Sequence, residues 1–475
     1  MDPTMCAHMT EEEFSEWYNA LIENAELSDK RYPVKGMNVW TPYGWRIMRN
    51  IDAAIRRELD ATGHGEVCFP LLVPATEFEK EAQHIKGFSD EVYWVTRAGG
   101  NELDVPLLLR PTSETAMYPI FKLWIRSHAD LPLKTYQIVN TFRYDTKMTR
   151  SFIRVREIHF FESHTCHVDF EDAERQIAED LEIWTKVSKD LALPYLVAKR
   201  PEWDRFPGAF YTIGFDVLMP AGRTMQMASV HQYKTNFAVP YEITYEDEKG
   251  EHQHAHQTTY GMSERLVGAI IAVHGDDKGI VMPPVVAPHQ VVVVPIFRKD
   301  DADEVLQAAQ QLYEELDEAG IRVKMDDRDL RPGEKYYYWE RRGVPLRLEL
   351  GPKDMKHGQV MVATRDVGEK AAVRRDEVVG RVEEMLAEMQ WRMLEKAEND
   401  LRERITDLPD IPYGFELEDV GRVGWCGEED CATQIEVNLE AVFLGEDMDM
   451  KRPPIERCTT CGGTAKMTAY VSKTY

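Results

Sequence analysis

The sequence predicts an α+β protein with an antiparallel sheet and flanking helices, then an α/β domain, then a small C-terminal α+β domain. Three observations lead to this fold class. Residues 142–164 read as two strands joined by a short polar loop, strands and helices alternate from Gln290 onwards, and two pairs of cysteines lie near the C-terminus. Strands joined by a short loop pair antiparallel, whereas alternating strands and helices favour a partly parallel sheet. A chain of 475 residues has room for two or three such domains.

The charge balance argues against one broad class of function. The chain carries 57 Lys and Arg against 83 Asp and Glu, which gives a formal net charge of −26. Such a charge disfavours indiscriminate binding to nucleic acids but leaves room for local basic patches. The seven cysteines are too few in so long a chain to form the disulfide framework of a secreted protein.

The sequence also lacks the marks of a secreted or membrane protein. Residues 1–24 are acidic and have no basic-then-apolar signal pattern. The longest apolar run, Val291–Phe297, is the length of a strand and far too short to cross a bilayer. We therefore expect a cytoplasmic protein with no membrane partner.

The N-terminal part predicts helices followed by a strand. Residues 1–24 form an N-terminal extension, and Thr41 is a typical N-cap for a long helix that ends near Gly63. The apolar face of that helix consists of Ile47, Ile51, Ile55 and Leu59. Residues 67–73 then read as a strand. Pro70 inside it lacks an N–H, which predicts an edge strand or an interruption of the ladder.

Residues 112–114 read Thr-Ser-Glu. This pattern is typical of a helix N-terminus, where Thr112 or Ser113 caps the helix and Glu114 complements its dipole. A carboxylate beside a hydroxyl also suits a cationic amine ligand. Both interpretations can hold together.

The stretch from Phe142 to His164 carries the clearest sign of chemistry. One face of its second strand is expected to carry, in order, Arg154, Arg156, Ile158 and Phe160. Cationic side chains on a sheet face are costly unless an anion pairs with them, and Arg143 adds a further cation. Arginines beside an aromatic ring suit a nucleotide, because the guanidinium binds phosphate oxygens at two points and the ring stacks on the base.

Arg143-Tyr144-Asp145, a loop and then Arg154 resemble motif 2 of the class II aminoacyl-tRNA synthetases. The resemblance extends to Thr112-Ser113-Glu114, to Gln226 with His231, and to Gly261-Met262-Ser263-Glu264-Arg265. In this order the motifs resemble the prolyl-tRNA synthetases of the archaeal and eukaryotic type, from about Pro33 to the end of the chain. The strand with Pro70 resembles motif 1, which implies a homodimer.

The resemblance implies a catalytic domain at residues 25–285 that ligates L-proline to tRNA(Pro) through a prolyl-adenylate. Arg143 and Arg265 are the implied catalytic residues, the first on the α-phosphate and the proline carboxylate, the second on the γ-phosphate. The implied ATP-binding residues are Arg143, Asp145, Arg154, Gln226, Ser229 and Arg265. Mg²⁺ is implied as a bridge between the phosphates.

The same resemblance implies a proline pocket. Its residues are Phe88, Glu91, Thr112, Glu114, Arg143, Phe160, Phe206, His231 and Ser263. The chain departs from the family at Ile158, where an adenine-stacking Phe is usual, and at Asp145, which replaces a Glu. Ser229 stands where the family often has Thr.

Residues 286–385 resemble an anticodon-binding domain. They predict strands at 291–295, 321–325, 346–350 and 359–363. Basic residues cluster with the aromatic run at 336–339, which favours nucleic-acid binding because aromatic rings stack on splayed bases. Glu340 and Arg347 lie in the segment that the family uses to read guanine bases.

Residues 386–475 form the predicted zinc-binding domain, which follows a helix expected over 376–404. Four thiolates complete a closed tetrahedral zinc site, and the candidates are Cys426, Cys431, Cys458 and Cys461. The resemblance implies that the terminal residue, Tyr475, reaches towards the active site.

Two alternatives remain open at this stage. One is a class II synthetase for another small amino acid, such as threonine or cysteine. The other is a non-catalytic, synthetase-like protein that binds tRNA, although Arg143, Arg154 and Arg265 are all present and speak against it.

Overall fold

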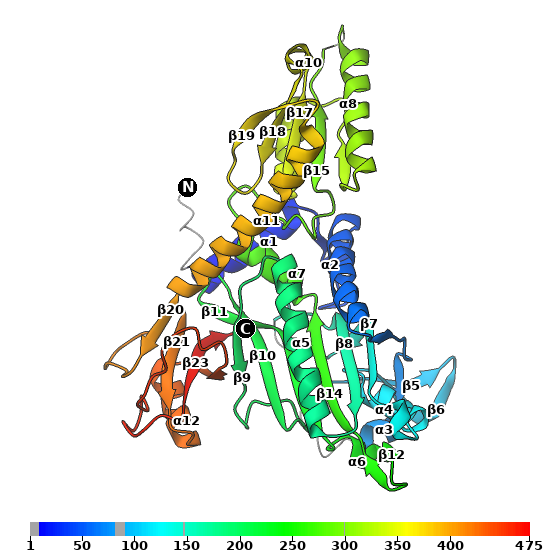
Figure 1. Cartoon of the computed structure of the whole chain (residues 1–475), viewed down its shortest axis with the longest axis vertical. Coiled ribbons are helices and arrows are strands. Elements are labelled where there is room, and N and C mark those ends of the chain that lie inside the picture. The colour runs from blue at the N-terminus through cyan, green and yellow to red at the C-terminus, as the bar shows by residue number, and fades with distance from the viewer. Residues whose placement is uncertain (1–8, 81–90, 146–147, 299) are drawn as a thin grey trace.

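The computed structural model describes residues 9–80, 91–145, 148–298 and 300–475. Its largest feature is an 11-stranded sheet in the order β20-β21-β23-β22-β9-β10-β11-β14-β8-β7-β3 (Figure 1). The strands of its central part are β3 (Gly65–Glu66), β7 (Leu133–Phe142), β8 (Glu157–His167), β9 (Leu196–Lys199), β10 (Tyr211–Leu218), β11 (Arg223–Lys234) and β14 (His256–Ser263). From β9 to β7 every neighbouring pair is antiparallel, which confirms the predicted sheet.

Long helices cover this sheet, as predicted. They are α1 (Glu11–Asn24), α2 (Pro42–Ala61), α5 (Phe170–Asp190) and α7 (Arg265–His274). The Thr41 hydroxyl accepts a hydrogen bond from the backbone N–H of Gly44 at the start of α2, and Asp169 accepts from the N–H of Asp172 at the start of α5. Each cap satisfies a backbone donor that the first helical turn leaves unpaired.

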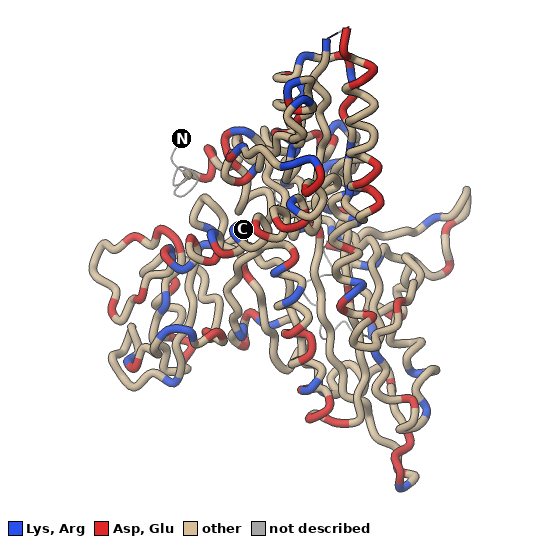
Figure 2. Tube along the Cα trace, turned by 45° about the horizontal axis from the view of Figure 1, so that its top comes forward, with Lys and Arg blue, Asp and Glu red and all other residues tan. Residues whose placement is uncertain are grey.

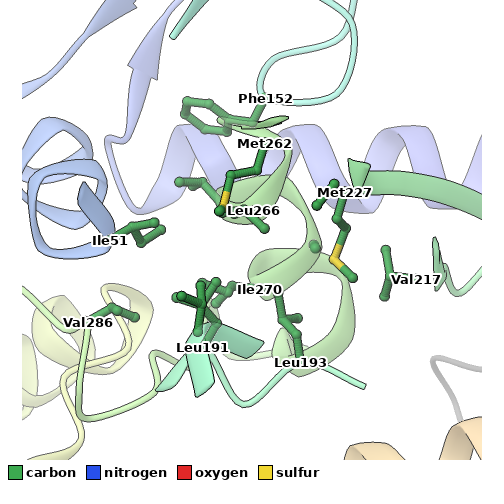
Figure 3. Packing of buried hydrophobic residues seen from close by; sticks show 14 of the residues in the cluster. Ile51, Phe152, Leu191, Leu193, Val217, Met227, Met262, Leu266, Ile270 and Val286 are labelled. Carbon is green, nitrogen blue, oxygen red and sulfur yellow. The ribbon is translucent and has the colours of Figure 1, made fainter. Parts of the chain in front are cut away.

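The core lies between α7 and the sheet. Figure 3 shows Leu266 and Ile270 of α7 among side chains from distant segments, namely Ile51 of α2, Phe152, Val217 of β10, Met227 of β11, Met262 of β14 and Val286. Phe14 and Tyr18 of α1 belong to the same buried cluster. Helix α1 therefore packs into the core beside the sheet, although residues 1–24 were predicted to form a separate N-terminal extension.

The hairpin of β7 and β8 differs from the prediction at its tip. The two strands pair from Phe142 opposite Glu157, so Arg154 and Arg156 lie in the loop and not on the strand face. Arg150 and Arg154 exchange two backbone hydrogen bonds of 2.9 Å, and Phe152 between them has a φ of 62°. This tight turn ends the strand pairing early.

The strand predicted over residues 67–73 is also wrong for most of its length, since only β4 (Leu72–Pro74) forms. The N–H of Val67 donates to Tyr136 O, and the N–H of Phe69 donates to the Gln137 side chain. Pro70 has no N–H with which to continue a ladder, so the chain leaves β7 and joins a separate sheet. That sheet has the order β4-β6-β5, with β5 at Tyr93–Ala98 and β6 at Asn101–Leu109.

Shorter elements complete this part of the molecule. They are β1 (Ser28–Asp29), β2 (Val39–Trp40), α3 (Ala75–Lys80), α4 (Glu114–Trp124), α6 (Ala238–Tyr241), β12 (Thr244–Glu246) and β13 (His252–His254).

The α/β unit stands above the large sheet in Figure 1. It comprises β15 (Val291–Pro295), α8 (Ala302–Glu318), β16 (Val323–Met325), α9 (Pro332–Arg341), β17 (Leu346–Leu350), α10 (Pro352–His357), β18 (Gln359–Thr364) and β19 (Lys370–Arg374). Its sheet has the order β16-β15-β17-β18-β19, and β15 runs parallel to both of its neighbours. Figure 2 shows that acidic residues recur along α8 at the top of the view.

Helix α11 (Val378–Glu403) connects the α/β unit to the C-terminal strands (Figure 1). The domain boundary predicted between residues 385 and 386 therefore lies inside helix α11. The C-terminal elements are β20 (Ile405–Leu408), β21 (Val420–Trp425), α12 (Glu429–Leu439), β22 (Val442–Asp447) and β23 (Met467–Thr474). Strand β22 pairs with β9, and β23 runs parallel to β11, so the C-terminal region continues the large sheet.

The last residue is held in place. The backbone N–H of Tyr475 donates to Thr224 O, and its ring lies 5.9 Å from that of Phe14. Thr224 precedes Gln226 on β11 by two residues. Over the described parts of the chain, no helix combines the length and apolar character needed to span a membrane.

Candidate active site

A cavity of about 530 Å³ opens on the large sheet, with walls from β8, β10, β11, β14 and the loop after β7. Thirteen of the predicted site residues line it: Glu91, Thr112, Glu114, Arg143, Asp145, Arg154, Phe160, Phe206, Gln226, Ser229, His231, Ser263 and Arg265. Phe88, also predicted, lies outside the described residues. Strands distant in sequence thus place these side chains around one space.

One end of the cavity is built around carboxylates. Glu114 accepts hydrogen bonds from the hydroxyls of Thr112 at 2.6 Å and Tyr233 at 2.9 Å. Ser113 occupies the N-cap position of α4 but makes no capping bond. Its hydroxyl and its backbone N–H donate instead to Glu162, at 2.6 and 2.9 Å. The Thr-Ser-Glu segment is therefore a helix N-terminus with Glu114 in the first turn, as predicted, but the Ser113 side chain binds Glu162 of β8 and does not cap the helix.

Glu162 and His164 were missing from the predicted site. Both are buried, and His164 Nε2 lies 3.3 Å from Glu162. Burial by itself raises the pKa of Glu162, but hydrogen bonds from His164 and Ser113 hold it below its ordinary value. The two residues follow Phe160 at alternate positions of β8. Extending the alternation that identified Phe160 would have found them.

The other end of the cavity is cationic. Burial, together with the nearby charges of Arg154 and Arg143, lowers the pKa of Arg265 to about 10. Arg265 Nε donates to Ile153 O at 2.9 Å, and its Nη1 donates to Gln226 O at 3.1 Å. Arg154 pairs with Asp145. Three guanidinium groups therefore converge on one region, and this concentration of positive charge suits an anionic ligand.

Arg143 lies where the two ends meet. It is half-buried, and this desolvation lowers its pKa, while the charges of Glu162, Glu114 and Glu91 oppose that shift. Its charge also acts on Arg265. The Arg143 Nε donates to Pro111 O at 3.2 Å, which fixes the guanidinium relative to the Thr-Ser-Glu segment.

Aromatic rings line the wall beside the carboxylates. The rings of Phe206 and His231 lie 4.8 Å apart. His231 makes hydrogen bonds with Thr212 at 2.9 Å and with Ser229 at 3.0 Å. Burial lowers the pKa of His231 to about 3, so the imidazole is neutral at physiological pH. A Cβ at position 261 would lie 3.1 Å from the Phe160 ring, so Gly261 leaves room for that ring.

The predicted cysteine cluster also assembles. Cys426, Cys431, Cys458 and Cys461 converge so that their four sulfur atoms lie within 4.8 Å of one another. Tetrahedral zinc binds thiolates at about 2.3 Å, which sets sulfur–sulfur separations near 3.8 Å. Small adjustments would bring the four sulfurs to that geometry, so the residues present fit a zinc ion.

Comparisons with known proteins agree with this geometry. The family model described as the tRNA synthetase class II core domain (G, H, P, S and T) matches residues 93–274, and an anticodon binding domain model matches residues 290–385. A proline–tRNA ligase of Thermococcus kodakarensis is 54% identical over 98% of both chains, and that of Methanosarcina mazei is 50% identical over 98% of this chain and 97% of its own. The chain belongs to the proline–tRNA ligase family.

A solved structure supports the same assignment at the level of the fold. The prolyl-tRNA synthetase of Giardia lamblia, in complex with prolyl-adenylate, superimposes with a TM-score of 0.93 at 34% identity, covering 98% of this chain and 99% of that one. The resemblance, the fold class and the enzyme class predicted from the sequence are thereby confirmed. The readings as a threonine or cysteine enzyme, or as a non-catalytic protein, are less well supported.

The two anticodon candidates lie in the α/β unit. Glu340 on α9 is 3.6 Å from Lys278, and Arg347 on β17 is 3.1 Å from Glu349. The Arg347 guanidinium also lies 4.1 Å from the centre of the Tyr336 ring. Both residues thus have partners within the chain, and a nucleic-acid base would have to compete with them.

The neighbouring aromatic run is largely covered by arginines. Tyr338 lies between Arg328 and Arg342, whose guanidinium carbons are 4.0 and 3.7 Å from its ring centre. Trp339 is buried. Of the four aromatic residues at 336–339, Tyr337 is the one classed as exposed, and Arg341 lies over its ring.

Proposed function

We propose that this chain joins L-proline to tRNA(Pro) in two steps, with ATP as the second substrate and prolyl-adenylate as the intermediate. The observation that carries the proposal is the division of the cavity into a carboxylate end and an arginine end with Arg143 between them. An amino-acid zwitterion followed by a triphosphate has the complementary order of charges.

The carboxylate end suits the amino group of proline. Glu114 would accept from the cationic imino group, and Thr112, which already donates to Glu114, fixes the direction of that carboxylate. The rings of Phe160 and Phe206 form apolar walls for the pyrrolidine ring. Glu91, His231 and Ser263 line the same space.

The arginine end suits ATP. Arg143 would hold both the proline carboxylate and the α-phosphate, and Arg265 would hold the γ-phosphate. Arg154, Asp145, Gln226 and Ser229 complete the nucleotide site that we propose, and Ile158 supplies apolar contact where the family usually has Phe. Gln226 and Arg265 are already joined by a hydrogen bond, so they would act together on the nucleotide.

The chemistry needs no nucleophile from the protein. A proline carboxylate oxygen attacks the α-phosphorus, and the bond to the β-phosphate breaks, so that pyrophosphate leaves with the bonding pair. A hydroxyl of the terminal tRNA ribose then attacks the carbonyl carbon, and AMP leaves. Positioning and charge neutralisation by Arg143 and Arg265 supply the catalysis.

Mg²⁺ would reach the cavity with ATP and neutralise part of the triphosphate charge. The chain offers a hard oxygen ligand at this end, since the Glu264 carboxyl group is buried beside Arg265 and lines the cavity. Asp145 offers a second one, although Arg154 pairs with it.

Proline-dependent exchange of pyrophosphate into ATP tests the proposed function directly. We expect exchange with L-proline that is at least about tenfold faster than with threonine or any other standard amino acid, since the rings of Phe160 and Phe206 line the space proposed for the pyrrolidine ring. Faster exchange with threonine would instead support the first alternative, and no exchange with any amino acid would support a non-catalytic protein.

We further propose the division into an N-terminal extension at 1–24, a catalytic domain at 25–285, an anticodon-binding domain at 286–385 and a zinc-binding domain at 386–475. The enzyme would work in the cytoplasm, where its tRNA substrate is charged. In this scheme Glu340 and Arg347 read guanine bases of the anticodon, since a carboxylate accepts from guanine N–H groups and arginine donates to O6 and N7.

Substitution of Arg347 by Ala is expected to weaken tRNA charging while sparing adenylate formation. The guanidinium lies in the α/β unit, far along the chain from the catalytic cavity, so its loss removes base contacts worth roughly 1–3 kcal/mol without touching ATP or proline. The KM for tRNA in aminoacylation should rise about tenfold, with pyrophosphate exchange unchanged. Equal loss of both steps would indicate misfolding and contradict the assignment.

A homodimer is also proposed. Exposed apolar side chains gather on the elements around the motif 1 segment, with Trp94 at 48%, Trp124 at 46% and Leu72 at 42% exposure. Such a patch on a large chain favours a second copy as its partner. A single-chain mass in sedimentation equilibrium would rule this interface out.

Structural zinc is proposed at the four cysteines. Substitution of Cys458 by Ser is expected to lower the zinc content and to impair aminoacylation mildly. The loss should stay local, because a core of apolar residues such as Phe443 and Val471 also stabilises this region. Metal analysis and thermal unfolding would measure both effects, with Cys68→Ser, an exposed cysteine outside the cluster, as the control. Absence of zinc from freshly purified wild type would refute the assignment.

A further inference from the structure

We propose that Arg200 is a positioning residue that sets the orientation of the Gln226 amide and connects the nucleotide end of the cavity to strand β22 of the C-terminal region. The inference rests on the proposed role of Gln226 in holding ATP. Neither Arg200 nor its partner Asp216 belonged to the predicted site.

Arg200 follows β9 and is almost fully buried. Its Nη2 lies 2.8 and 2.7 Å from the two carboxylate oxygens of Asp216 and donates to Gln226 Oε1 at 3.2 Å. Its Nη1 donates to the backbone oxygen of Leu444 on β22 at 2.9 Å. One side chain therefore contacts a buried carboxylate, a residue of the cavity wall and the C-terminal strand.

The contact with Gln226 fixes which end of its amide faces a ligand. A guanidinium group has donors only, so the atom of Gln226 beside it must be the carbonyl oxygen. The amide nitrogen is then the end left to face the cavity that Gln226 lines. The Gln226 side chain is thereby oriented to donate a hydrogen bond into the cavity. A phosphate or ribose oxygen of a ligand can accept that bond, whereas a donor group of a ligand cannot.

Gln226 is held from both sides. Arg200 binds its side chain, and Arg265 Nη1 donates to its backbone oxygen at 3.1 Å. Arg265 in turn donates to Ile153 O in the loop after β7. A continuous set of hydrogen bonds therefore runs from Leu444 on β22 through Arg200, Gln226 and Arg265 to that loop.

The surrounding fold is shaped for this guanidinium. A Cβ at position 214 would lie 2.3 Å from Arg200 Nη2, so Gly214 on β10 leaves the space that the group occupies. A Cβ at position 445 would lie 2.1 Å from Lys199 O, so Gly445 lets β22 approach the residue before Arg200. A buried arginine is tolerated here because Asp216, also buried, balances its charge.

A merely structural role is the alternative, and Arg422 provides the matched control. Arg422 is equally buried in the same sheet, on β21, and binds Asp447 at 3.0 Å and Asp407 at 2.8 Å. Neither carboxylate lines the cavity. Replacing Arg422 by Lys should therefore disturb the C-terminal region as much as replacing Arg200 by Lys, without changing the orientation of Gln226.

The test compares KM values in proline-dependent pyrophosphate exchange. Lysine at position 200 keeps the charge beside Asp216, but its single ammonium group cannot reach all three partners at once. We expect Arg200→Lys to raise the KM for ATP about tenfold, as the loss of one oriented hydrogen bond predicts, and to change the KM for proline less than about twofold. Arg422→Lys should leave both values unchanged.

A double-mutant cycle separates this inference from the proposed function. Gln226→Ala should raise the KM for ATP, and Arg200→Lys should add nothing in that background. If Gln226→Ala leaves the KM for ATP unchanged, the proposed role of Gln226 fails, and the inference fails with it. If Gln226→Ala raises it but Arg200→Lys does not, or adds its full effect to the double variant, the inference alone is overturned.

A second variant covers the case in which Arg200→Lys fails to fold. Arg200→Gln combined with Asp216→Asn removes both buried charges together and still withdraws the guanidinium from Gln226. The same rise in the KM for ATP is expected, with thermal unfolding confirming a folded protein. An unchanged KM for ATP in this folded variant would overturn the inference.

Discussion

Replacing Arg143 by Ala is expected to reduce proline-dependent pyrophosphate exchange by about 100-fold to 1,000-fold. Arg143 lies between the carboxylate end and the arginine end of the cavity, where the proposed function places the proline carboxylate against the α-phosphorus. Charge develops there as the new bond forms, and removal of one preorganised donor at such a position costs about 2.7–4 kcal/mol. Measurement of kcat/KM for exchange tests this, because the effect should fall on the adenylation step itself.

Two further substitutions make the test specific. Arg143→Lys keeps the charge but not the two-point contact, so an intermediate loss is expected. Arg150→Lys is the matched control, since Arg150 belongs to the same loop but its guanidinium pairs with Glu11, at 2.8 Å, and does not line the cavity. If the Arg150 variant lost as much activity as Arg143→Ala, disruption of the loop would explain both results.

Much of the fold was predictable from local signals. Thr41 caps a helix as its sequence position suggested, and β15 spans Val291–Pro295 as the apolar run indicated. These features depend on neighbours in the chain, so the sequence carries them directly. The strand predicted at 67–73 failed because Pro70 interrupts the ladder, and its partner strand could not be seen from the sequence.

The continuation of the sheet into the C-terminal region could not be predicted for a related reason. The contacts of β22 with β9 and of β23 with β11 join residues more than 200 positions apart, and no local pattern specifies such pairing. The result places Leu444 and Tyr475 beside the catalytic part of the sheet, a relation that the cysteine spacing alone does not reveal.

The candidate site likewise contains residues that the sequence identified and residues that it did not. Arg143, Glu114 and Gln226 were found through the order of motifs in the family, and the cavity brings them together. Glu162 was missed because it belongs to none of the recognised motifs, although its alternation with Phe160 along β8 was available. Arg200 was missed because its role depends on its contact with Asp216 and on the space that Gly214 leaves for it. Both residues lie on the neighbouring strand β10, so these contacts form only in the folded chain.

Replacing Glu114 by Gln is expected to raise the KM for proline about tenfold to 100-fold in pyrophosphate exchange, with the KM for ATP changed less than about twofold. The amide keeps the size of the side chain and one acceptor oxygen, so the hydrogen bond from Tyr233 can persist. It loses the negative charge that, in the proposed function, pairs with the imino group, and hydrogen bonds to charged groups are worth roughly 1.5–3 kcal/mol. The loss should therefore appear in proline binding and not in nucleotide binding.

Glu174→Gln is the control for Glu114→Gln, because Glu174 likewise accepts a hydrogen bond from a tyrosine hydroxyl, that of Tyr211, at 2.7 Å, but lies outside the cavity. Glu174→Gln involves a similar loss of charge and a similar change in hydrogen bonding. It should nevertheless leave the KM for proline and the KM for ATP unchanged. Unchanged proline kinetics in Glu114→Gln would contradict the proposed contact between Glu114 and the imino group. In that case Glu162, the other buried carboxylate at this end of the cavity, would be the residue to substitute next.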